Sequence, residues 1–101
     1  MTAESTRTTS DFGSSLAALM REQGISYRML ASRTSLSAGY LNHLVHGNRP
    51  VPANGVIERI AAALAVPPER FREYRLRVVT ERLAELPELV DRLYREMHDG
   101  G

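Results

Sequence analysis

The stretch SYRMLASRTSLSAGYLNHLVHG, which runs from Ser26 to Gly47, decides the fold of this chain. It predicts two short helices joined by a tight turn. Ser26 can cap the first helix, because a serine hydroxyl accepts a hydrogen bond from the free N–H groups at a helix start. Ser37 stands where a second helix needs the same acceptor, and Thr34 and Ser35 end the first helix. This arrangement is typical of a helix-turn-helix.

The apolar residues of this stretch should share one buried side of the helix pair. The residues that follow this spacing are Leu30, Ala31, Leu36, Leu41 and Leu44. Ala31 is the smallest of them, and it falls where the two helices have to approach each other closely. The stretch therefore predicts both the motif and the side on which the motif packs.

The same residues resemble the helix-turn-helix of the phage-repressor and Cro class, the XRE-like regulators. The matching positions are Ser26, Ala31, Leu36–Ser37, Tyr40–Leu41 and His46–Gly47. The resemblance covers roughly Phe12 to Phe71. Two positions depart from the family pattern, since Tyr27 stands where glutamine is usual and Ser35 stands where the turn usually has glycine. A serine adopts the left-handed turn geometry only at some conformational cost.

The resemblance implies an all-helical, five-helix repressor-like domain over Phe12–Phe71, extended by one or two C-terminal helices. Asp11 would cap the first helix, Gly24 would end it, and Phe71 would close the bottom of the core. The expected organisation is a flexible N-terminal arm at residues 1–10, a helix-turn-helix DNA-binding domain at 11–72 and a C-terminal helical dimerisation segment at 73–98.

The segment after the motif supplies the fourth helix. Two prolines and a glycine make Gly47–Pro52 a loop, and Pro52 fits the first turn of the helix that follows. That helix is amphipathic, with apolar residues at spacings of three and four. Gly55 weakens its start, and a close approach by another backbone would explain a glycine at this position.

The apolar residues of the C-terminal region recur in alternating steps of three and four, the spacing of a heptad seam. They are Leu76, Val79, Leu83, Leu86, Val90, Leu93 and Met97. Pro87 interrupts the seam because a proline inside a helix removes a hydrogen bond, so we expect a kink or break near Glu85–Pro87. We expect the seam to form a homodimer interface, and the alternative is that it folds back on its own domain.

The composition of the 101 residues fits one modest globular domain. The chain has no cysteine, so neither a disulfide framework nor a thiolate zinc site is available. No apolar run approaches the ~20 residues needed to span a bilayer, and the N-terminus lacks the apolar core of a signal peptide. We therefore expect a cytoplasmic protein with no membrane partner.

Charge is segregated along the chain, although the formal net charge is only +1. No acidic residue occurs from Gln23 to Ile57, whereas acidic residues concentrate after Val66. The basic residues and histidines of the acid-free part are Arg28, Arg33, His43, His46 and Arg49. An acid-free, arginine-bearing stretch over the motif favours contact with a polyanion.

In motifs of this class the second helix lies in the major groove of DNA and presents its first turns to base edges. The resemblance places the base-reading positions on Ala38, Gly39, Asn42 and His43. Ala38 could touch only a thymine methyl group. Gly39 offers no hydrogen bond, but it would let the helix lie deep in the groove. Asn42 and His43 are therefore the expected base readers, with an ordinary solvated helix face as the alternative.

Contacts to the DNA backbone are expected from side chains around the motif and from the free N–H groups at the helix starts. These side chains belong to Tyr27, Arg28, Ser37, Tyr40 and Arg49. Tyr40 is usually half-buried in this family, with its hydroxyl free to reach a phosphate. For Arg33, a phosphate contact and a solvated helix end remain equally open.

Other kinds of site have little support in the sequence. His43 and His46 have a spacing that could ligate a metal, but zinc wants three or four ligands, and no cysteine or nearby carboxylate supplies the rest. No phosphate loop, nucleophile elbow or paired carboxylates are visible. We therefore expect no enzyme activity, no cofactor, no metal and no small-molecule ligand.

The expected function is sequence-specific DNA binding as a transcriptional regulator, with repression favoured, by a homodimer that reads a palindromic operator. Its partners would be double-stranded DNA and a second copy of itself. The alternative is a protein-interaction module that binds another regulator, a sigma factor or a toxin through the motif or the C-terminal helices. The small side chains at Ala38 and Gly39 support this alternative, and the salt dependence of duplex binding distinguishes the two.

Overall fold

The computed structural model describes residues 11–99, and all regular structure in that range is helical. The helices are α2 (Phe12–Gln23), α3 (Tyr27–Thr34), α4 (Ala38–Val45), α5 (Asn54–Ala63), the 3-10 helix η1 (Pro68–Arg70), α6 (Arg72–Ala84) and α7 (Pro87–Asp99). This confirms the predicted all-helical class. The predicted N-terminal arm, residues 1–10, lies outside the described part. None of the described helices is long and apolar enough to cross a membrane.

Side-chain caps begin α2, α3 and α4, as the sequence predicts. The Asp11 carboxylate accepts a hydrogen bond from the Ser14 N–H at 2.9 Å, and Ser26 and Ser37 cap α3 and α4 in the same way. Hydrogen bonds from the backbone N–H and the hydroxyl of Ser14 lower the pKa of Asp11. At the other end of α2, Gly24 adopts the left-handed conformation with φ 65° and stops the helix.

The turn between α3 and α4 passes through Ser35, which is left-handed with φ 63°. Its neighbour Thr34 is buried and holds the turn from inside. The Thr34 hydroxyl donates to the Leu30 carbonyl at 2.8 Å and accepts from the Leu36 N–H at 3.3 Å. These bonds offset the cost of a left-handed residue other than glycine.

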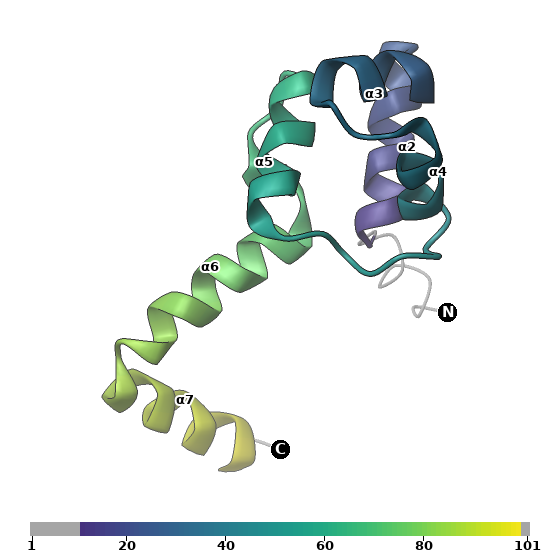
Figure 1. The fold of residues 1–101 in the computed structure, drawn as a ribbon. Coiled ribbons are helices and arrows are strands. Elements are labelled where there is room, and N and C mark those ends of the chain that lie inside the picture. Colours follow the sequence, from purple (N-terminus) through teal and green to yellow (C-terminus); the bar gives the residue numbers. More distant parts are fainter. Residues whose placement is uncertain (1–10, 100–101) are drawn as a thin grey trace.

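The core lies between α2, α3, α4 and α5, which Figure 1 shows gathered at one end of the molecule. Phe71 is fully buried beneath them. Its ring packs on that of Phe12 with centroids 4.7 Å apart and a tilt of 40°. The predicted closure of the core by Phe71 is confirmed.

Three local expectations need correction. The five helices do not fit within the expected range Phe12–Phe71, because Pro68–Arg70 forms a 3-10 turn and the fifth helix, α6, begins only at Arg72. Pro52 does not lie in the first turn of the fourth helix, since α5 starts at Asn54. Pro52 is instead buried in the loop before α5, where its carbonyl accepts a hydrogen bond from Arg77 of α6. A Cβ atom on Gly55 would meet open space rather than a neighbouring backbone. The close backbone approach occurs at Gly13.

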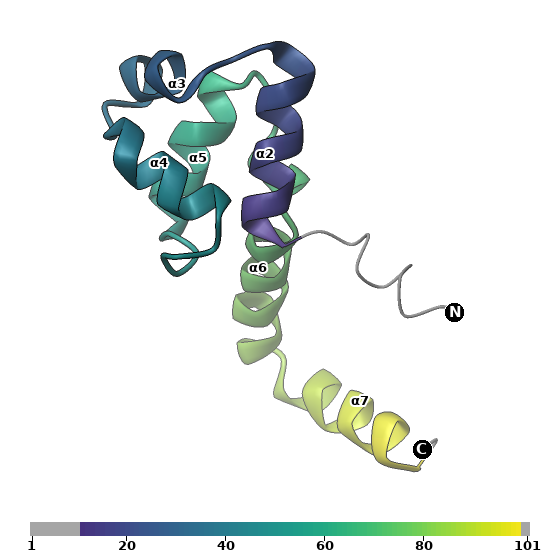
Figure 2. The same ribbon diagram turned by 90° about the vertical axis from the view of Figure 1, so that its right-hand side faces the viewer.

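Helix α6 leads away from the core and α7 turns off at its end, as Figures 1 and 2 both show. The predicted break is confirmed, since α6 ends at Ala84 and α7 begins at Pro87. The first turn of α6 is fastened to the core by polar contacts. The Phe12 N–H donates to the Glu73 carboxylate at 3.1 Å, and the Tyr74 hydroxyl donates to Glu58 at 2.7 Å. The latter bond raises the pKa of Tyr74.

Candidate nucleic-acid interface

The outer face of α4 carries the four residues predicted to read bases. Ala38, Gly39, Asn42 and His43 are all exposed, while Leu41 and Leu44 on the opposite side are buried. Residues separated by one, four and five positions share one face of a helix. The structure therefore brings the four positions together on one accessible surface, and Asn42 and His43 supply its hydrogen-bonding groups.

His46 belongs to the end of α4 rather than to this surface. Its ring Nδ1 lies 2.9 Å from the Asn42 carbonyl oxygen, and its backbone N–H donates to the same oxygen at 3.1 Å. The ring thus closes the last turn of the helix. Within residues 11–99, no three histidine or carboxylate side chains come together in a way that could hold a metal ion.

The start of α4 offers a positive electrostatic environment. The Ser37 hydroxyl accepts from the Tyr40 N–H at 3.0 Å, which leaves the other N–H groups of the first turn directed outward. The first turns of α3, α4 and α5 contain no acidic residue. The partial positive charge at these three helix starts is therefore not neutralised by a carboxylate in the turn, which suits a phosphate group.

The side chains predicted to contact a DNA backbone lie around α4. Arg28 on α3 and Arg49 in the loop after α4 are exposed, as is Ser37. Tyr27 and Tyr40 are half-buried and pack against the core. These positions allow the arginines to reach a polyanion, and they give the tyrosines a packing role beside any phosphate contact.

Arg33 makes a contact with α5 while its side chain stays exposed, so a phosphate contact by Arg33 stays a prediction. Its guanidinium donates to the Ala63 carbonyl at the end of α5, at 3.4 Å. In return, Arg59 on α5 donates to the Thr34 carbonyl at the end of α3. Each arginine satisfies a carbonyl that the other helix leaves free at its C-terminus. The two arginines therefore link the C-terminal ends of α3 and α5.

Arg49 lies in the loop between α4 and α5 and lines a hollow. This cavity of about 210 Å³ lies between the loop and the start of α2 and is lined by Asp11, Phe12, Gly13, Leu44, Gly47, Arg49, Pro50 and Val51. At its far end the loop is held by Arg77 of α6, whose guanidinium donates to the Pro52 carbonyl at 2.7 Å. No local sequence pattern indicates this contact, because the two residues are 25 positions apart.

Gly13 is a second residue that sequence reasoning missed. A Cβ atom at Gly13 would lie 2.6 Å from the Leu44 carbonyl oxygen and 2.7 Å from that of Val45. Only glycine lets α2 approach the end of α4 so closely. The sequence does contain an indication of this contact. A glycine inside the first turn of a predicted helix weakens that helix, and a close approach by another segment would explain its presence.

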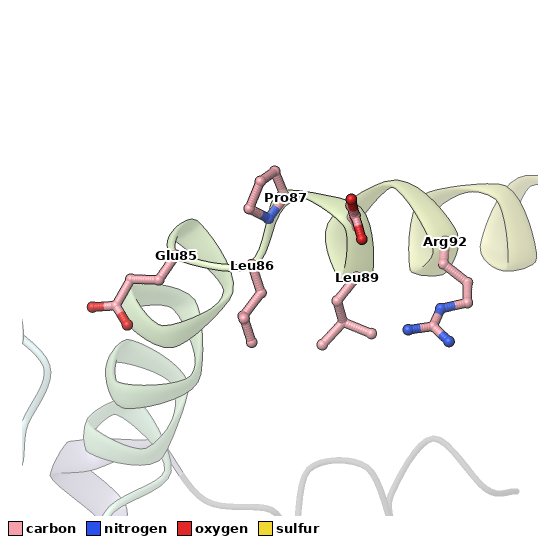
Figure 3. A pocket seen from close by; sticks show the side chains of 6 residues that line it. Glu85, Leu86, Pro87, Leu89 and Arg92 are labelled. Atoms are coloured by element: carbon pink, nitrogen blue, oxygen red, sulfur yellow. The ribbon is translucent and has the colours of Figure 1, made fainter.

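The residues predicted to form a dimer interface are not buried in the single chain. Leu76, Val79, Leu86, Val90, Leu93 and Met97 are exposed, and Leu83 is half-buried. In the angle between α6 and α7, a hollow of about 500 Å³ is lined by Glu85, Leu86, Pro87, Glu88, Leu89 and Arg92. Figure 3 shows Leu86, Leu89 and Arg92 pointing to the same side of this angle. The seam does not fold back on the domain.

Comparisons with known proteins agree with this geometry. Residues 11–74 match the protein family described as a helix-turn-helix domain. Among solved structures, the chain is similar to the crystal structure of the clp gene regulator ClgR from Corynebacterium glutamicum. The TM-score is 0.54 at 25% sequence identity, over 78% of this chain and 88% of that chain. No curated protein matches the sequence.

Proposed function

The chain belongs to the helix-turn-helix domain family, and from this membership we propose that it is a sequence-specific DNA-binding transcriptional regulator, a repressor of the XRE type. The observation that carries the proposal is the exposed face of α4 within a stretch free of acidic residues. The likeness to a gene regulator over 88% of that protein supports a regulatory role. Its place of action would be the cytoplasm, where the DNA partner is accessible.

In this proposal α4 lies in the major groove. The Asn42 amide can pair with the edge of an adenine through one donor and one acceptor, and the His43 ring can donate to or accept from a neighbouring base. Ala38 can touch a thymine methyl group. Gly39 has no atoms within 4 Å of a Cβ position, so its lack of a side chain leaves room for the helix to approach the bases.

Backbone contacts would fix the register of α4 on the duplex without reading sequence. Arg28 approaches from α3 and Arg49 from the loop after α4, and both guanidinium groups match the geometry of a phosphate. The helix starts capped by Ser26 and Ser37 add N–H donors directed at phosphate oxygens. Tyr27 and Tyr40 would contribute their hydroxyl groups from the half-buried edge of this surface.

We further propose that two copies pair through α6 and α7. Exposed apolar side chains continue from Leu76 to Met97, and water disfavours such a continuous stripe. A two-fold dimer would place two α4 helices about one DNA turn, ~34 Å, apart, so that the pair reads a palindrome. A dimer bound across a promoter would exclude polymerase from it, which is how repression would follow.

Selection of bound sequences from a random duplex pool tests this function. We expect the full-length chain to enrich an inverted repeat with half-sites about 10 base pairs apart, centre to centre. Enrichment of a single half-site would contradict the dimer while leaving DNA reading intact. The absence of any enriched sequence, with the protein folded, would favour a protein-interaction module, which the small residues Ala38 and Gly39 also fit.

A further inference from the structure

We propose that Arg77 is a positioning residue for DNA binding, which holds the loop after α4 so that Arg49 meets a phosphate. This inference rests on the proposed function. Arg77 lies on α6, outside the helix-turn-helix motif, and its side chain is partly buried against the loop. It touches no part of the base-reading face, so its action on DNA would pass through the loop and the start of α5.

The contacts of Arg77 converge on the end of the loop. One guanidinium nitrogen donates to the Pro52 carbonyl at 2.7 Å and to the Asn54 side-chain oxygen at 2.8 Å. The other nitrogen donates to the Val51 carbonyl at 3.5 Å. A planar guanidinium presents its donors in a fixed fork, so it sets the relative positions of all three acceptors. Charge-assisted hydrogen bonds of this kind are stronger than neutral ones.

Arg77 adds polar contacts at the end of the loop, where Val51 packs against the core and Pro52 is buried. The loop leaves α4 through Gly47, which is left-handed with φ 74°, and its exposed residues 48–50 then pass beside the hollow of about 210 Å³. The residue before α5, Ala53, provides no side-chain cap. Arg77 therefore fixes both the exit of the loop and the first residue of α5, and these two points determine where Arg49 can reach.

The test compares Arg77→Met with Arg75→Met. Methionine keeps an unbranched apolar stem but removes the donors. Arg75 is a matched control, because it lies on the same helix and also donates to backbone carbonyls, those of Glu69 and Arg70 at 2.9 and 3.3 Å. These acceptors belong to η1, away from the loop. The dissociation constant for the selected duplex is measured for each variant, with and without Arg49→Ala.

We expect Arg77→Met to weaken binding by roughly ten-fold, the scale of one lost phosphate contact, while Arg75→Met changes it little. In the Arg49→Ala background the effect of Arg77→Met should largely disappear, since the contact that it positions is already absent. Amide hydrogen exchange at Asn48, which donates to the His43 carbonyl, and at Val56 and Ile57, which donate to the Ala53 carbonyl, should accelerate in Arg77→Met alone. If that variant does not fold, Arg77→Lys should show the same pattern with a smaller loss.

Two results would overturn the inference. Wild-type affinity in the Arg77 variants would mean that the clamp does not matter for DNA. An equal loss with and without Arg49→Ala would mean that Arg77 does not act by positioning Arg49. If the wild-type chain bound no duplex, the proposed function itself would fail, and this inference would fail with it. Wild-type binding combined with either of the first two results rejects the inference alone.

Discussion

Gly13 in the first turn of α2 lies so close to Leu44 at the end of α4 that a Cβ atom on Gly13 would stand 2.6 Å from the Leu44 carbonyl oxygen. This contact is between two helix backbones, so a small side-chain movement cannot relieve it. It determines how closely α2 packs against α4, the helix that is proposed to enter the major groove. The position of the exposed face of α4 therefore depends on a residue of another helix.

Gly13→Ala should destabilise the protein. The added methyl group requires a backbone shift, and overpacking of this kind costs about 1–3 kcal/mol. Gly55→Ala is the matched control, because Gly55 is also the second residue of its helix and has nothing within 4 Å of the Cβ position. We expect this control to gain up to about 1 kcal/mol. Urea unfolding measures both, and equal stability of the two variants would contradict the role given to Gly13.

Asp11 should make the stability depend on pH. The Ser14 hydrogen bonds lower the pKa of Asp11 in the folded protein below its unfolded value. The contribution of the carboxylate is therefore present above the unfolded pKa and is lost as the pH falls through the folded one. Asp11→Ala should reduce the free energy of unfolding by about 1 kcal/mol near neutral pH.

The difference between wild type and Asp11→Ala should shrink below about pH 4, where the carboxyl group takes up its proton. Asp11→Asn is the control, because it keeps an acceptor for the Ser14 N–H but does not titrate. Unfolding curves across this pH range measure all three proteins. A gap between wild type and the alanine variant that stayed constant down to the acid limit would show that the Asp11 charge does not contribute.

Asn42→Ala and His43→Ala should each weaken binding to the selected duplex by roughly 1–3 kcal/mol and relax the preference at one base pair. Each variant loses a hydrogen-bonding group on the exposed face of α4, while the phosphate contacts remain. Binding to random DNA should barely change. Repeating the selection with each variant provides the measurement, and an unaltered selected sequence in both would show that the recognition surface lies elsewhere.

Leu83→Asp with Val90→Asp should convert a dimer into monomers, because both side chains belong to the apolar stripe that pairing would bury. Truncation after Tyr74 should have the same effect. Arg95→Asp lies on the opposite, polar side of α7 and serves as the control. Sedimentation gives the mass, and binding to the palindrome is measured in parallel. Dimers that persisted in the truncated chain with undiminished affinity would reject this interface.

The features that could be predicted from the sequence depend on residues close together in the chain. The caps at Asp11, Ser26 and Ser37 and the break at Pro87 each follow from one residue and its immediate neighbours. Even the unusual left-handed Ser35 could be predicted, because the family pattern marks the turn.

The missed features depend on contacts between distant segments. Arg33 reaches the end of α5, 30 positions away, and Arg77 reaches the loop from 25 positions away. An arginine on an amphipathic helix gives no local indication of which carbonyl it will meet. The acid-free stretch predicts a candidate surface, but only the structure shows that one of its exposed arginines, Arg33, also contacts a neighbouring helix.

The salt dependence of duplex binding tests the central claim most directly. The measurement is the dissociation constant of the full-length chain for its selected duplex over a series of salt concentrations. If α4 and its surrounding arginines bind DNA, the logarithm of the binding constant should fall linearly with the logarithm of salt, by about 0.9 for each phosphate neutralised. A folded chain that bound no duplex even at the lowest salt would contradict the proposal.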